Sequence, residues 1–75
     1  MAEFKDRLKQ LRKERGLTQK ELAEIFKTTG VAIGRYEKGL REPNNLDTLI
    51  GLAQFFDVST DYLLGLSDER KKNSD

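Results

Sequence analysis

The sequence predicts one small all-α domain built from five short helices. A chain of 75 residues has the length of a single domain. Several segments repeat apolar residues at the three- and four-residue spacing of an amphipathic helix. Threonine, asparagine or serine precedes four of these segments and glycine follows three of them, as helix N-caps and C-caps do. Together these features predict short helices with defined ends.

Two of the predicted helices and a tight turn between them occupy residues 18–37, TQKELAEIFKTTGVAIGRYE. Thr18 and Glu21 have the spacing of a capping box, which predicts the start of the first of these helices. The apolar period breaks at residues 27–29. Thr29 is placed to cap the second helix and Gly39 to end it in a left-handed conformation.

Three further helices complete the predicted fold. The first is expected over residues 3–15. The fourth follows either Asn44 or Asn45 as its N-cap, and the last begins at Ser59 and ends at Gly65. The apolar faces of the five helices predict one core, which consists of Phe4, Leu8, Leu11, Leu22, Ala23, Phe26, Ile33, Leu49, Leu52, Ala53, Phe56 and Leu63.

The composition argues against several classes of function. The chain has no cysteine and no histidine, so it has no thiolate ligand, no disulfide and not the commonest general base. An enzyme would need a carboxylate pair or an activated lysine, and the acids are scattered along the helices. We therefore expect no enzymatic activity, metal, cofactor or small-molecule ligand. No long apolar run or signal-peptide pattern is present, which favours a cytoplasmic protein that does not enter a membrane.

Charge is distributed unevenly although the net charge is only +1. Residues 1–20 carry seven Lys/Arg and three acids, whereas residues 46–66 carry three acids and no base. This asymmetry is typical of a protein that turns one face toward a polyanion. Solvated helix faces with ion pairs between residues four apart would explain the charges equally well.

A set of spaced motifs resembles the helix-turn-helix of Cro/cI-type repressors, the XRE family. These motifs are TQxELA at residues 18–23, IxRYEKG at 33–39 and DYLLG at 61–65, with Arg41–Glu42–Pro43 between them. The resemblance implies a five-helix, lambda-repressor-like DNA-binding domain over residues 1–66. Residues 67–75 have no helical period and are expected to form a disordered charged tail.

The implied function is a sequence-specific regulator of transcription, a repressor that places the helix from about Gly30 to Glu37 in the major groove of operator DNA. The positions that match base-reading positions of the family are Gly30, Val31, Ala32, Gly34 and Arg35. The positions expected at phosphates are Gln19, Lys38 and Arg41, with the hydroxyls of Thr28 and Thr29.

Direct reading of bases is expected to be sparse. Among the five base-reading positions only Arg35 has a side chain that can hydrogen-bond a base edge, and it is expected to contact either a guanine or only a phosphate. Val31 and Ala32 can contact thymine methyl groups. A protein-interaction module of the same fold, which binds another regulator or a toxin and only weakly binds DNA, is therefore the alternative function.

The resemblance implies three further features. Arg12 and Glu37 form a partly buried ion pair. Lys27 stands where many relatives have glycine, at a position that needs a positive φ. The protein binds DNA as a homodimer, through a surface around the last helix that consists of Asp57, Val58, Thr60, Tyr62 and Leu66. Tyr62 and Leu66 would instead close the edge of the core if this surface is not an interface.

Overall fold

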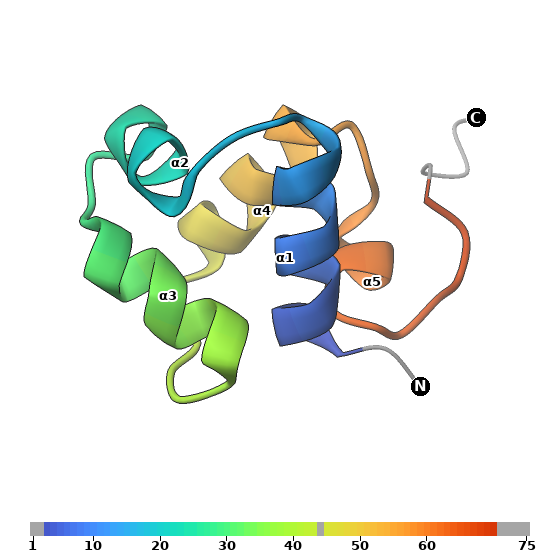
Figure 1. The fold of residues 1–75 in the computed structure, drawn as a ribbon. Helices are drawn as coiled ribbons and strands as arrows, with labels where there is room; N and C mark the ends of the chain where they lie inside the picture. The colour runs from blue at the N-terminus through green and yellow to red at the C-terminus, as the bar shows by residue number, and fades with distance from the viewer. Residues whose placement is uncertain (1–2, 44, 71–75) are drawn as a thin grey trace.

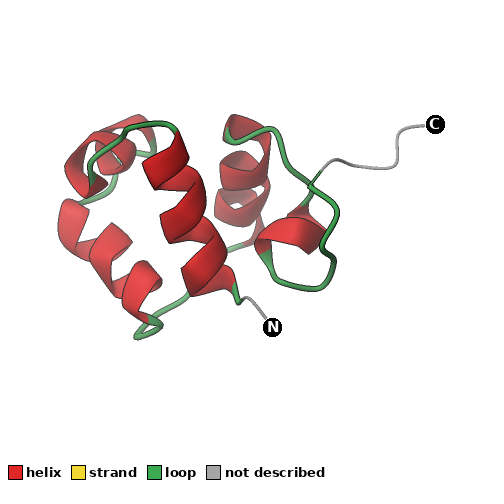
Figure 2. Cartoon of the chain, turned by 45° about the vertical axis from the view of Figure 1, so that its right-hand side comes forward, coloured by secondary structure: helices red, strands yellow, loops and turns green. Residues whose placement is uncertain are grey.

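The computed structural model of the protein describes residues 3–43 and 45–70, and this part of the chain is all-α (Figure 1). No strand occurs among these residues, and the loops that join the helices are short (Figure 2). The all-α prediction is therefore confirmed. The helices are α1 (Phe4–Glu14), α2 (Gln19–Ile25), α3 (Gly30–Lys38), α4 (Leu46–Phe55) and α5 (Thr60–Leu63).

The N-terminus of each helix after α1 is capped by the residue that the sequence indicates. Thr18 and Glu21 form both hydrogen bonds of a capping box, at 2.8 and 3.0 Å. Thr29 and Ser59 accept hydrogen bonds from backbone amides three residues ahead. Asn45 Oδ1 accepts from Thr48 N at 2.8 Å, so Asn45 caps α4, and Asn44 lies outside the described residues.

The turn between α2 and α3 has a close counterpart between α4 and α5. The two turns follow similar sequences, LAEIFKTT at residues 22–29 and LAQFFDVS at 52–59. Lys27 has the expected positive φ, 55°, and Asp57 has a φ of 56°. In both turns the next amide donates to the carbonyl five residues back, at 2.9 Å. The left-handed conformation of Asp57 was not predicted from the sequence.

One apolar core joins the helices, and it differs from the predicted core at its edges. Phe26, the C-cap residue of α2, and Leu49 of α4 pack against this core but remain partly exposed. Val58, which was expected on a dimer surface, is buried within the chain, and Tyr62 is buried as the alternative, a place at the edge of the core, required. Leu66 is exposed, so the same alternative is wrong for Leu66. The buried apolar residues are Phe4, Leu8, Leu11, Leu22, Ala23, Ile33, Leu52, Ala53, Phe56, Val58, Tyr62 and Leu63.

Residues 67–70 run back along α1 and the start of α5. Arg7 Nη2 donates to Asp68 Oδ1 at 2.9 Å, and the Arg7 guanidinium lies 3.8 Å from the centre of the Tyr62 ring. Arg70 makes two hydrogen bonds to Glu14, at 2.7 and 2.8 Å. Residues 71–75 lie outside the described residues, so disorder there stays a prediction. No helix in the described part is long and apolar enough to cross a membrane.

Candidate nucleic-acid interface

The helix α3 packs against both α1 and α2 and leaves its outer side exposed (Figure 1). Ile33 anchors α3 in the core, and Glu37 is buried one turn further on. Three residues of the remaining surface, Val31, Arg35 and Lys38, are exposed. The helix α3 is therefore amphipathic: its buried residues hold it in place, and its exposed residues face the solvent.

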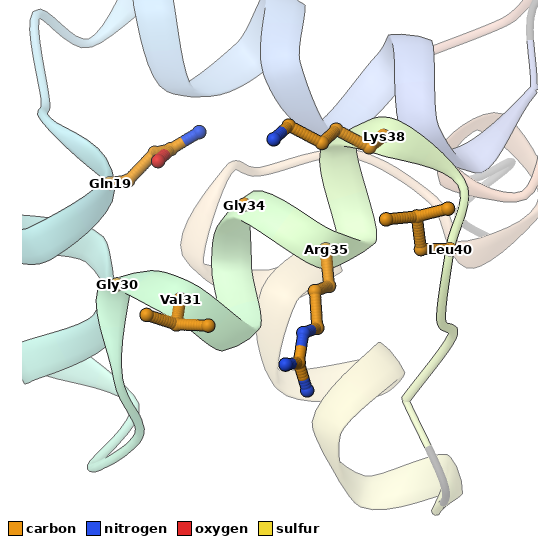
Figure 3. Close-up of a pocket in the computed structure, with 7 residues that line it drawn as sticks. All are labelled: Gln19, Gly30, Val31, Gly34, Arg35, Lys38 and Leu40. Carbon is orange, nitrogen blue, oxygen red and sulfur yellow. The ribbon is translucent and has the colours of Figure 1, made fainter.

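A surface groove of about 370 Å³ runs along this exposed face (Figure 3). Its floor includes two glycines, so no side chain of α3 fills it there. A Cβ atom at Gly34 would lie 3.3 Å from Gln19 Oε1, and one at Gly30 would lie 3.6 Å from the backbone of Lys20. The residues around the groove are Gln19, Gly30, Val31, Gly34, Arg35, Lys38 and Leu40.

A buried ion pair connects α1 with the last turn of α3. Arg12 Nε donates to Glu37 Oε2 at 2.6 Å, and Arg12 Nη2 donates to Glu37 Oε1 at 3.0 Å. Arg12 Nη1 also donates to the carbonyl of Leu17 at 2.7 Å. The hydrogen bonds to Glu37 raise the pKa of Arg12 above its ordinary value. This is the pairing that the family resemblance implies.

Gln19, the first residue of α2, takes part in the same network. Its Nε2 donates to Glu37 Oε1 at 3.2 Å, and its side chain is only partly exposed. Figure 3 shows Gln19 and Lys38 pointing toward one another on the same side of α3, with Arg35 directed away from both. The Gln19 amide therefore lies against α3 and borders the groove.

Three cationic side chains near α3 have no partner among the residues that the structure describes. Arg35, Lys38 and Arg41 are exposed, and within residues 3–43 and 45–70 none of them forms an ion pair or a side-chain hydrogen bond. Arg7, Arg12 and Arg70 pair with carboxylates elsewhere on the domain, whereas Arg15 and the lysines within the described residues form no ion pair. Unpaired cations on one face are what a polyanion requires.

The groove brings together six of the ten predicted DNA-binding residues. Thr28, Thr29, Ala32 and Arg41 do not border it. Thr29 Oγ1 already accepts the hydrogen bond that caps α3. Leu40, 73% exposed at one end of the groove, was not predicted, because a single leucine in a loop has no pattern that distinguishes it from a core residue.

A family model described as helix-turn-helix (HTH_3) matches residues 8–63 of this chain. The match covers more than half of the sequence and includes all residues of the groove. The chain belongs to the Cro/cI-type (XRE) helix-turn-helix family. The resemblance of the three sequence motifs to this family is thus confirmed.

Individual relatives agree with this assignment. The chain is 45% identical over 67 residues to the HTH-type transcriptional regulator ImmR of Bacillus subtilis (strain 168), a match that covers 89% of this chain and 52% of ImmR. It is 40% identical over 62 residues to the HTH-type transcriptional activator BcrR of Enterococcus faecalis, covering 83% of this chain and 30% of BcrR. The chain therefore spans about half of the first relative and less than a third of the second.

A solved structure of the P22 c2 repressor, in complex with synthetic operator 9T in the presence of Tl+, has the same fold. The TM-score is 0.80 at 28% sequence identity, and the match covers 89% of this chain and all of the other. The five-helix, repressor-like fold expected from the sequence is confirmed by this similarity. No group of three acidic, histidine or cysteine side chains within residues 3–43 and 45–70 has the arrangement of a metal site.

Proposed function

We propose that this domain is a sequence-specific, double-stranded DNA-binding regulator of transcription that represses by occupying an operator. One observation carries the proposal: the exposed face of α3 combines an open groove with unpaired cations, Arg35 and Lys38. A helix of this kind fits the major groove of B-DNA, which is wide enough to admit it. The regulators and the repressor–operator complex among the relatives support the same function.

In this proposal the residues around α3 have two roles. Val31 and Ala32 contact thymine methyl groups, Gly30 and Gly34 allow the helix backbone to approach the bases, and Arg35 donates to guanine. Lys38 and Arg41, with Thr28 and Thr29, contact phosphates on either side of the major groove of the DNA. These contacts supply affinity without sequence information. The exposure of Val31 (64%) supports its contact with an apolar part of the DNA.

We further propose that the protein binds as a homodimer through the surface around α5. With Val58 and Tyr62 inside the core, the surface that remains is formed by Asp57, Thr60 and the apolar side chains of Leu64 and Leu66. Leu66 is 75% exposed. A two-fold dimer would place two copies of α3 on half-sites that are about 34 Å apart.

Selection of bound duplexes from a random DNA pool at physiological salt tests the proposed function. We expect a two-fold symmetric motif whose half-sites lie about one helical turn apart. Binding should weaken steeply as salt increases, because the cations displace counterions from phosphates. If the selection enriches a single half-site without a symmetric repeat, the proposal of DNA binding stands and the proposal of a homodimer is wrong.

The same selection separates this function from the alternative, a protein-interaction module that binds another regulator or a toxin. Such a module would show binding without a motif, or no binding to duplex DNA at all. Val31 and Leu40, both exposed beside the groove, would then form part of a protein contact.

A further inference from the structure

The orientation of the Gln19 side chain is fixed by the chemistry of its neighbour. Gln19 Nε2 lies 3.2 Å from Glu37 Oε1, and the two oxygens of Glu37 each accept a hydrogen bond from Arg12. An ionised carboxylate only accepts hydrogen bonds, so the nitrogen end of the Gln19 amide must face it. The oxygen end of the amide is thereby turned away from Glu37.

That oxygen lies over the glycine in the middle of α3. Among the atoms of Gln19, Oε1 is the nearest to the position of a Cβ at Gly34, at 3.3 Å, and Nε2 follows at 3.7 Å. Within the described residues no donor hydrogen-bonds to Oε1. One of the two N–H groups of Nε2 is used by Glu37, and the other is available. The groove floor thus presents one acceptor and one donor on the same planar group.

The two glycines of α3 leave this amide accessible from the groove. Any side chain at Gly34 would lie against the Gln19 amide, and one at Gly30 would stand beside the start of α2. Each glycine costs about 1 kcal/mol of helix stability relative to alanine. Val31 and Arg35 border the groove on the side away from Gln19, as Figure 3 shows. The edge of a flat group can therefore reach the Gln19 amide at the bottom of the groove. Val31 and Arg35, at the border of the groove, would not contact that edge by themselves.

We propose that Gln19 reads an adenine in the major groove, with Gly34 as the position that keeps its amide accessible. This inference rests on the proposed DNA-binding function and assigns Gln19 a base instead of a phosphate. The Oε1 atom accepts from adenine N6, and the second N–H of Nε2 donates to adenine N7, the pairing that glutamine makes with adenine. Glu37 positions the amide by holding its other N–H.

The proposal accounts for the scarcity of hydrogen-bonding side chains on α3. In the part of α3 that borders the groove, only Arg35 and Lys38 carry polar side chains, and both are cations that suit guanine or phosphate. An acceptor that can select an exocyclic amine must come from another helix. Gln19 on α2 is the only groove residue among those described that supplies one through its side chain.

The test measures the affinity of the full chain for the selected duplex and for every single-base-pair change within it, at several salt concentrations. For the wild-type protein we expect discrimination of about tenfold or more at one A·T pair in each half-site. Replacing that adenine with 7-deazaadenine, which lacks the N7 acceptor, should lower the affinity by a similar factor. Gln19→Ala should abolish this discrimination, keep the preferences at the other positions and leave the salt dependence unchanged.

A second variant and a matched control distinguish a loss of base recognition from a loss of the folded structure. Gly34→Ala favours the helix, so α3 should remain folded, but its Cβ would lie 3.3 Å from Gln19 Oε1, so the amide must shift by a few tenths of an ångström and is partly covered. We expect it to reduce the discrimination at the same A·T pair. Gln54→Ala removes an exposed glutamine of α4 outside the groove and should change nothing. If Gln19→Ala unfolds, because Glu37 loses a donor, Gly34→Ala decides the question.

Three results would overturn the inference. An equal loss of affinity on all sequences, with the discrimination at the A·T pair retained, would make Gln19 a phosphate contact. If a folded Gln19→Ala protein keeps the discrimination at the A·T pair, Gln19 contacts no base and serves only as a hydrogen-bond donor to Glu37. Wild-type protein without salt-sensitive duplex binding would overturn the proposed function itself, a result that the first two cannot produce.

Discussion

Arg12 on α1 and Glu37 on α3 are joined by two charge-assisted hydrogen bonds, and Gln19 on α2 donates a third to the same carboxylate. The side chains of Arg12 and Glu37 are 11% and 3% exposed. Three helices thus meet at one buried carboxylate. Because Glu37 is in the last turn of α3, this contact fixes the orientation of the helix that we propose to enter the major groove.

Removal of either partner should leave the other buried and uncompensated. We expect Arg12→Ala to lower the free energy of unfolding by about 3 kcal/mol, a large part of the stability of a domain of this size. Urea denaturation followed by far-UV circular dichroism measures this loss. The double variant Arg12→Met/Glu37→Met, which removes both charges and fills the space, should recover much of it. A loss under about 1 kcal/mol for Arg12→Ala would show that the pair contributes little.

Arg35→Ala should weaken DNA binding selectively. If Arg35 donates to guanine, we expect a loss of about 1–3 kcal/mol at sites that carry that base and little loss elsewhere. Lys38→Ala is the matched comparison, since it removes an exposed cation that we assign to phosphate. It should weaken all sites alike and reduce the salt slope by about one. A uniform loss for Arg35→Ala, measured by fluorescence anisotropy on the selected site and its variants, would reassign Arg35 to phosphate.

The helices and caps that were predicted correctly depend on residues close together in the sequence. Helix starts depend on a side chain and an amide three residues apart, as at Thr18 and Asn45. The five helices follow from the apolar period within each segment. Lys27 was identified from its position in the family motif, and Asp57 was missed because no motif marks it, although its turn has the same geometry.

The features that were missed depend on contacts between distant segments. Tyr62 was left open between a dimer surface and the edge of the core, because its burial depends on the packed core and on Arg7, which covers its ring from another helix. The direction of the Gln19 amide depends on where Glu37 lies when α2 meets α3. The sequence therefore identified six of the seven residues around the groove and, through the family resemblance, the Arg12–Glu37 pair, but not the contact between Gln19 and Glu37.

The ion pair between Glu14 and Arg70 should make stability depend on pH. The hydrogen bonds from Arg70 hold the pKa of Glu14 below its ordinary value. A lowered folded-state pKa stabilises the protein above the unfolded-state pKa of about 4.3, and this stabilisation is lost as the pH falls through the folded-state value. We expect Glu14→Gln to lower the urea midpoint slightly at pH 7. At pH values below the folded-state pKa of Glu14, it should have no effect.

Glu24→Gln is a suitable control for this pH dependence. Glu24 is an exposed acid of α2 that forms no ion pair with another described residue. Its replacement should leave the difference in urea midpoint between neutral and acid pH unchanged. An effect of Glu14→Gln that is the same at both pH values would mean that the pair with Arg70 contributes nothing to folding.

The two left-handed residues should respond differently to glycine. Lys27 and Asp57 have nearly the same φ, 55° and 56°, but aspartate tolerates the left-handed region better than lysine. We therefore expect Lys27→Gly to raise the free energy of unfolding by about 1 kcal/mol and Asp57→Gly to raise it by less. Glu24→Gly, in the helix that ends at the first turn, should instead lower it by about 1 kcal/mol. Thermal or urea denaturation gives this ranking, and destabilisation by Lys27→Gly would show that the lysine side chain stabilises the turn by more than the backbone strain costs.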